Sequence, residues 1–443
     1  MAPEKDLENN KQENGFETLE VQEKNATLFV DDEYYMQLHA IRAKMPDTVS
    51  SAYFWFVLPI LSMSPVCGSS YTMLKWSLGG SFSLRAYFSH FNCDLFCRTG
   101  RAKIDYGELG ELACSYGPNW IKNRGNVLKQ VINISLYVLQ YGSCAVYFIF
   151  IAENVRQVAD PDRTLPLTAY VAMFLPVELA LCSIRQLKWL AIPSTGANGL
   201  YIIAFISIFY YVFSDFPSWQ RLPSIQNVAL WPLAFGTIMF AFNSSGMIIP
   251  IENRCRTPGN LLRWNGVINV SYMIITIISA AVGFYGYIKY GYDIQGSITL
   301  NLPQSEPLAQ AVKIMAAITI ILSFPVQFYS ATEVIIEIIN KRVKSPKKAL
   351  MVEYAVRYLV VIIIFAFAVL IPRLGLFISL VGALTGSILA FFFPPIIDVF
   401  VQYRGHKRPA WLYINNLLCF AFGMIGLVSG TATSIAAIVE SFS

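Results

Sequence analysis

Long apolar runs alternate with short polar stretches along most of this chain. A helix that spans a bilayer needs about 20 mostly apolar residues. Because lipid offers the backbone no hydrogen-bond partners, such runs must be helical, and no strand-type alternation competes with them. The pattern therefore predicts an all-α polytopic membrane protein with nine secure spans, at residues 130–152, 167–184, 189–214, 222–251, 264–288, 314–332, 358–372, 374–397 and 409–439.

The distribution of Lys and Arg predicts which ends of these spans face the cytoplasm. Cytoplasmic loops of membrane proteins are enriched in these two residues. In this chain 20 of them fall in one alternate set of connections and 6 in the other. We therefore predict that the richer set is cytoplasmic, namely the connections after residues 94, 184, 251, 332 and 397.

The first hundred residues fit the pattern less well. Residues 1–47 are polar and acidic and predict a flexible tail, followed by a transmembrane domain at 48–443. Two further spans within 48–97 are doubtful. Prolines interrupt the first of them, and the second contains Arg85 and Asp94. A charge at the bilayer centre costs at least about 2.5 kcal/mol.

Composition narrows the possible functions. Of the 443 residues, 55% are hydrophobic and 14% charged, which is more apolar surface than one soluble core can hide. The net charge of +5 lies in short connections, so it predicts membrane orientation and not nucleic-acid binding. The eight cysteines show no paired metal-ligand spacing, and no span combines a nucleophile with a base. We expect no metal, no cofactor and no enzymatic activity.

The span at 222–251 contains a polar, flexible patch beside two aromatic residues. A broken helix exposes backbone amide and carbonyl groups inside the membrane, where they can bind a polar solute. The patch predicts such a break, although a glycine kink that eases helix packing is the alternative interpretation. The candidate substrate-binding residues here are Phe240, Phe242, Asn243, Ser244 and Gly246.

Polar residues on two other spans are further candidates for substrate binding. Gln140 and Tyr147 lie two helical turns apart and share one face of their span. Ser323 and Gln327 lie one turn apart on a later span. We predict that Gln140 and Tyr147 point at one cavity and that all four residues bind substrate. The alternative is that their side chains only bond neighbouring helices.

Three glutamates in or near spans are candidates for carrying a proton. Glu333 and Glu337 stand close to Lys341 and Arg342, where ordinary salt bridges are the simpler interpretation. Glu178 lies within its span, whose amphipathic pattern turns the carboxyl toward the bundle. It is therefore the candidate for proton coupling.

Several stretches from residue 105 onward have a specific order of residues. They read DYGE at 105–108, QYGSCAVYF at 140–148, IRQLK at 184–188, FGT at 235–237 with PIEN at 250–253, and YGYDIQGSITLNLP at 290–303. In these stretches the chain resembles the proton-coupled amino-acid transporter branch of the amino acid/auxin permease superfamily, in a form similar to those of insects.

The resemblance implies an inverted-repeat transporter fold of eleven transmembrane helices, with substrate held at mid-membrane by discontinuous helices. It adds Thr237, in the sixth-span motif, to the candidate substrate-binding residues. It also implies a secondary active transporter that works by alternating access. The expected partners are small neutral amino acids, protons as the coupling ion, and the lipid bilayer.

The chain departs from the family at two places. It lacks the Gly-Asn-Ile-Gly-Thr-Gly type motif of the first span, and Asn243 stands where the family commonly has a glutamate. Either residues 48–97 have diverged or the gene model mistranslates an exon. A non-transporting amino-acid sensor or an inactive paralogue on the same scaffold is therefore the alternative function. The expected location is the plasma membrane, with the lysosomal membrane as the alternative.

Overall fold

The computed structural model describes residues 105–185, 187–214, 228–241, 267–343, 345–371, 373–403 and 410–442. Within these ranges every regular element is helical, as the apolar pattern predicts. The predicted tail at 1–47 and the doubtful spans within 48–97 lie outside the described residues.

Each of the nine predicted runs contains a helix of the structure. The helices in these runs are α7 (Gly125–Ala159), α8 (Leu167–Cys182), α9 (Leu187–Phe213), α10 (Trp231–Ala241), α13 (Val267–Tyr290), α14 (Pro307–Arg342), α15 (Pro346–Leu370), α16 (Leu374–Val381) with α17 (Phe393–Gln402), and α18 (Ala410–Glu440). Two π-helical segments, η5 (Gly382–Gly386) and η6 (Ile388–Phe392), join α16 to α17. The remaining helices are α5 (Tyr106–Tyr116), α6 (Asn119–Lys122), η2 (Val228–Leu230), η3 (Gly291–Asp293) and η4 (Ile298–Asn301).

Five helices of the described chain are long and apolar enough to cross a membrane. They cover Gly125–Ala159, Pro307–Ile336, Lys347–Leu370, Leu374–Phe400 and Tyr413–Glu440. Three shorter apolar helices are Leu167–Cys182, Gly199–Phe213 and Trp231–Ala241. The protein is therefore an all-α polytopic membrane protein.

Several helices extend well beyond the charge-free runs that predicted them. The predicted run at 314–332 begins one residue after Lys313, yet α14 begins at Pro307. The predicted run at 358–372 likewise begins one residue after Arg357, whereas α15 begins at Pro346. Both cations are buried in the structure. The predicted boundaries were wrong because a packed bundle supplies partners for buried charges that lipid does not.

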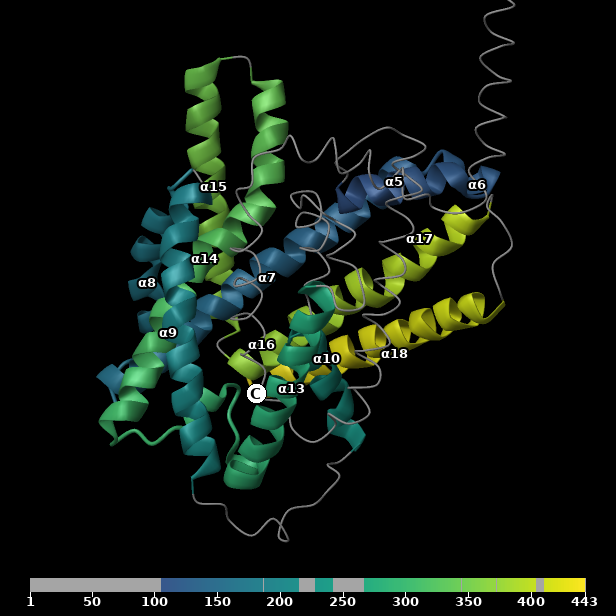
Figure 1. Ribbon diagram of the computed structural model, residues 1–443. Coiled ribbons are helices and arrows are strands. Elements are labelled where there is room, and N and C mark those ends of the chain that lie inside the picture. Colours follow the sequence, from purple (N-terminus) through teal and green to yellow (C-terminus); the bar gives the residue numbers. More distant parts are fainter. Residues whose placement is uncertain are drawn as a thin grey trace, which may run out of the picture.

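Helix α7 forms the centre of the bundle. Its stretch from Cys144 to Ala152 is buried on every side, with each residue at most 2% exposed. A helix that is apolar all round is buried, and α7 packs against α5, α8, α14, α15 and α16. Figure 1 shows this long helix crossing between the α8, α9, α14 and α15 group and the α16 to α18 group.

Glycines bring α10 and the α16–η5 segment into backbone contact. A Cβ atom added to Gly382 would clash with the carbonyl oxygen of Gly236 and with the amide nitrogen of Phe240. One added to Gly236 would clash with Ser379. Small residues allow close approach of transmembrane helices. These contacts hold the candidate residues of α10 directly against the π-helical part of the chain.

Contacts between helix ends agree with the sides predicted from charge. At the predicted cytoplasmic ends, Arg185 after α8 pairs with Glu353 of α15. At the opposite ends, Tyr211 of α9 donates a hydrogen bond to Glu306 before α14, and Gln157 of α7 bonds to Leu300 in η4. Connections assigned to the same side therefore meet in space.

Candidate functional site

Two of the predicted substrate-binding residues, Gln140 and Gln327, meet between α7 and α14. The Nε2 group of Gln327 donates to the Oε1 atom of Gln140. Gln140 in turn donates from its own Nε2 to the hydroxyl of Ser330, at 2.9 Å. Both glutamines are 7% exposed. The two amides thus bond directly to each other between the two helices, which satisfies part of the hydrogen-bonding capacity of both.

Tyr147 and Ser323 also lie in the interior, on the same two helices. Tyr147 is fully buried, and its hydroxyl has no hydrogen-bond partner among the described residues. Ser323 is 7% exposed and donates to the carbonyl of Thr319, one turn earlier on α14. Thr319 donates to the carbonyl of Ala197 on α9. A common cavity for Gln140 and Tyr147, and substrate binding by Ser323 and Gln327, stay predictions.

Only part of the predicted site on the sixth span falls within the described residues. The hydroxyl of Thr237 donates to the carbonyl of Leu233, one turn back on α10. Phe240 is 2% exposed and packs in the main hydrophobic core. The other predicted residues, Phe242, Asn243, Ser244 and Gly246, lie outside the described part of the chain.

Glu178, the candidate for proton coupling, lies on α8 and is buried. Its side chain is 0% exposed, and neither carboxyl oxygen has a hydrogen-bond partner in the described chain. Cys182 lies one turn further along α8, and its thiol is buried as well. An ionised carboxylate without a partner in such surroundings costs far more free energy than a neutral carboxyl.

The sequence analysis missed a group of buried charges at the ends of the spans. Glu353 and Arg357 on α15 are 3% and 2% exposed at their side chains and form an ion pair of 3.1 Å. Lys313 on α14 is 0% exposed and donates to the carbonyl of Leu302. The Glu-x-x-x-Arg spacing of one helical turn was the available signal, but the requirement for charge-free runs placed both residues outside the span.

Within the described chain no cluster of three His, Cys, Asp or Glu side chains has an arrangement that could hold a metal ion. The described cysteines, Cys114, Cys144, Cys182 and Cys419, are buried free thiols. The described candidate groups are thus amides, hydroxyls and one carboxyl, which can bind polar small molecules and protons.

Residues 78–436 match the family described as "Transmembrane amino acid transporter protein". The chain belongs to this family. The match begins at residue 78, so it reaches into the region that the sequence analysis found doubtful.

Two relatives of this transmembrane amino acid transporter family member cover most of its length. The fruit-fly protein named "Proton-coupled amino acid transporter-like protein pathetic" is 31% identical over 352 residues, which is 79% of this chain and 74% of the relative. The nematode (Caenorhabditis elegans) protein named "Probable amino acid transporter skat-1" is 27% identical over 366 residues, 78% of each chain. The fruit-fly species is Drosophila melanogaster.

Proposed function

We propose that the chain is a secondary active transporter of small neutral amino acids that works by alternating access and is coupled to protons. The family and the names of both relatives support an amino-acid substrate. The name of the fruit-fly relative supports protons as the coupling ion. The single observation that carries the proton proposal is the buried carboxyl of Glu178, whose oxygens have no partner in the described chain.

The character of the candidate residues supports a neutral substrate. Those that the structure describes on α7, α10 and α14 carry amide, hydroxyl or aromatic groups and no formal charge. A charged substrate side chain would need an opposite charge, because an isolated buried charge is strongly unfavourable. The ammonium and carboxylate of a zwitterion can instead be bound by amide groups, hydroxyls and exposed helix ends. The described candidate residues are Gln140, Tyr147, Thr237, Phe240, Ser323 and Gln327.

Glu178 lies where a proton could change the state of the bundle. One turn beyond it on α8, the carbonyl of Cys182 accepts a hydrogen bond from Arg357 of α15. With its proton bound, the carboxyl adds no charge to the interior. After the proton leaves, the carboxylate needs water or a cation, which favours a different arrangement of α7, α8 and α15.

Uptake into proteoliposomes tests this proposal. We expect purified protein to accumulate labelled proline, glycine or alanine faster when the outer buffer is more acidic than the lumen. Glu178→Gln keeps the shape of the side chain but cannot lose a proton. It should abolish stimulation by the pH gradient and leave exchange of labelled for unlabelled substrate within about threefold of the wild type.

Asp162→Asn is the matched control, because Asp162 is an exposed carboxyl in the connection after α7. It should retain the full response to the pH gradient. Normal gradient stimulation in Glu178→Gln would contradict the role of Glu178. Absence of both uptake and exchange in the wild type would contradict transport itself.

A non-transporting amino-acid sensor is the second candidate, favoured by the missing glycine motif of the first span. A sensor would bind amino acids without moving them. Thermal stabilisation of the purified protein by proline, glycine or alanine, together with no exchange in proteoliposomes, would support the sensor over the transporter.

A further inference from the structure

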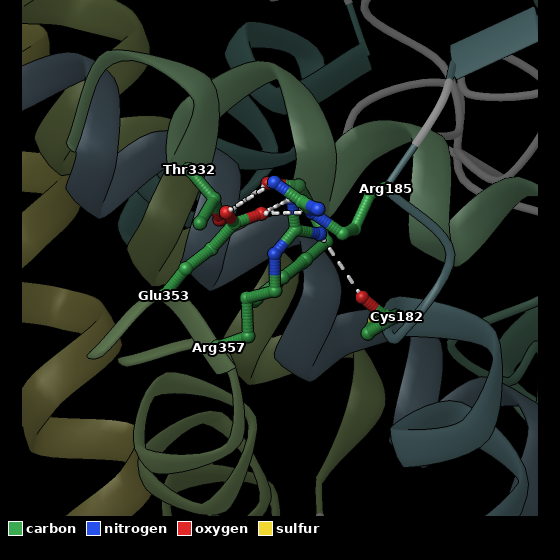
Figure 2. Close-up of polar contacts among 6 residues, drawn as sticks. Cys182, Arg185, Thr332, Glu353 and Arg357 are labelled. Atoms are coloured by element: carbon green, nitrogen blue, oxygen red, sulfur yellow. Dashed lines mark hydrogen bonds and ion pairs between the residues drawn. The ribbon is translucent and has the colours of Figure 1, made fainter. Parts of the chain in front are cut away.

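An ion pair ties the start of α9 to α15 at the predicted cytoplasmic end of the bundle. Arg185, in the connection between α8 and α9, donates from Nε to one oxygen of Glu353 at 3.1 Å and from its terminal nitrogen to the other at 2.9 Å. Such two-point contacts between a guanidinium and a carboxylate fix geometry as well as charge. Figure 2 shows the guanidinium groups of Arg185 and Arg357 at the Glu353 carboxylate.

The inner member of this cluster is a permanent part of the bundle. Arg357 bonds to Glu353 on its own helix and to the carbonyl of Cys182 at the end of α8, at 3.1 and 3.0 Å. It also lies 6.0 Å from the ring centre of Tyr329 on α14. Three helices therefore meet at one buried guanidinium, and separating it from Glu353 would leave an unpaired charge in the interior.

The outer member can leave at much lower cost. The side chain of Arg185 is 50% exposed, against 3% for Glu353. When Arg185 moves into water, Glu353 still has Arg357 as a partner, so no buried charge is left unpaired. Water can hydrate the half-exposed guanidinium of Arg185 when it leaves, so its release costs less free energy than separating the two buried groups of the Glu353–Arg357 pair. The cluster thus combines a stable inner pair with a releasable outer contact.

The helix that follows Arg185 is weak in its first half. Pro193 lies inside α9, where a proline cannot donate the backbone hydrogen bond of a helix. Gly196 and Gly199 follow it, and a Cβ atom added to either would meet no atom of the described residues within 4 Å. This stretch therefore has both a missing backbone bond and open space beside it, which are the requirements for a bend.

The first half of α9 covers α14 at the level of a candidate substrate residue. Thr319 of α14 bonds to the carbonyl of Ala197, and Ser323 lies one turn further along α14. One turn before Ala197 lies Ser194, which is 0% exposed and has no hydrogen-bond partner in the described chain. Moving this part of α9 would uncover the α14 face that carries Ser323.

We propose that the Arg185–Glu353 ion pair is a releasable latch, and that its release lets the first half of α9 bend at Pro193 to Gly199 and opens a path from the cytoplasm to Ser323. This inference rests on the proposed alternating-access function, since it identifies the segment that opens on the predicted cytoplasmic side. The latch accounts for the position of a half-exposed arginine on a buried carboxylate that already has a partner.

Labelling of a thiol introduced by Ser194→Cys tests the latch. The variant changes one buried oxygen to sulfur and breaks no hydrogen bond of the described chain. A membrane-impermeant charged maleimide is applied to the cytoplasmic face of proteoliposomes, and modification at position 194 is followed by mass spectrometry. Adding Arg185→Ala should speed this modification about fivefold, and Arg185→Lys, which keeps one contact point, should give an intermediate rate.

Lys347→Ala is the matched control, because Lys347 is an exposed cation at the start of α15 on the same predicted side. It should leave the rate unchanged. Raising the salt concentration from about 0.05 M to 0.5 M should speed modification in the Ser194→Cys parent, because salt screens exposed charges. The salt effect should vanish once Arg185 is removed, and this parent measurement decides the question if Arg185→Ala does not fold.

An unchanged rate in Arg185→Ala, or an equal increase in Lys347→Ala, would refute the latch. The labelling needs no substrate, so it separates the two proposals. Faster labelling in Arg185→Ala combined with no exchange by the wild type would support the latch and reject transport. Exchange by the wild type combined with unchanged labelling in Arg185→Ala would support transport and reject the latch.

Discussion

The cations at the two ends of the bundle have different kinds of partner. At the predicted cytoplasmic end, Arg185 and Arg357 share the carboxylate of Glu353. At the opposite end, Lys289 donates to the carbonyl of Ser214 at 2.8 Å, and Lys313 donates to that of Leu302 at 3.1 Å. No ion pair of either lysine is found in the described chain.

This difference separates a releasable end from a fixed one. A carboxylate with two cationic partners can lose the exposed partner and stay neutralised. A fully buried lysine that bonds to a carbonyl has no such substitute, so moving that carbonyl away would leave an ammonium unsolvated. We infer that the segment after α13 is a fixed cap over α7 and α14, whereas the connection between α8 and α9 can move once the proposed latch is released.

The largest effect is expected from removing the shared carboxylate. Glu353→Leu leaves Arg357 buried without an anion, and should lower the free energy of unfolding by about 3–5 kcal/mol. The thermal unfolding midpoint of the detergent-purified protein measures this loss. The double variant Glu353→Leu, Arg357→Met removes both buried charges and should recover most of the stability. If Glu353→Leu is as stable as the wild type, the Glu353–Arg357 pair does not stabilise the structure.

Gln157→Leu, at the end of the bundle opposite the predicted cytoplasmic end, should cause a smaller loss in the free energy of unfolding. The amide of Gln157 donates to the carbonyl of Leu300 at 3.2 Å in a buried place. Leaving this carbonyl unpaired should cost about 1–3 kcal/mol. It should also speed hydrogen exchange of the backbone amides in residues 296–302, which mass spectrometry can measure.

Gln310→Leu is the matched control for this end. Gln310 donates to the carbonyl of Gln304 at an exposed position, where water can replace the bond. Its loss should stay within about 0.5 kcal/mol. Equal effects of the two glutamine variants would remove the distinction between a buried cap and an exposed turn.

The smallest expected effect is on the pH dependence of stability, through Asp160 at the end of α7. Backbone hydrogen bonds from Leu165 and Thr164, with a further bond from the Thr164 hydroxyl, hold the pKa of Asp160 below its ordinary value. Its contribution to stability is therefore complete above the unfolded-state pKa of about 3.9 and is lost as pH falls through the lower folded value. Asp160→Asn should reduce the fall of the unfolding midpoint between pH 6 and pH 3, and identical acid profiles would contradict this assignment.

Helix positions could be read from the chain because a lipid environment leaves the backbone little choice. The uncharged run at 374–397 predicted a span, and a helix runs from Leu374 through the π-helical turns. The same criterion failed at the starts of α14 and α15. It treated Lys313 and Arg357 as incompatible with a span, although each finds a partner inside the folded bundle.

The candidate site was predictable in part. Spacing placed Gln140 and Tyr147 on one helix face, and both are buried in the structure. Spacing did not show that the amides of Gln140 and Gln327 bond to each other, because helix periodicity says nothing about which helices are neighbours. The family motif supplied Thr237, whose hydroxyl bonds within its own helix.

The sequence by itself determined that this protein lies in lipid, that it is helical, and to which family it belongs. Each of these follows from local composition or from residue order, which need no knowledge of distant contacts. Only the tertiary structure decided which charges could be buried and which contact could be released. Arg185 and Glu353 lie 168 positions apart in the chain, and no local pattern pairs them. Their pairing arises because packing of α8 against α15 brings both to one end of the bundle.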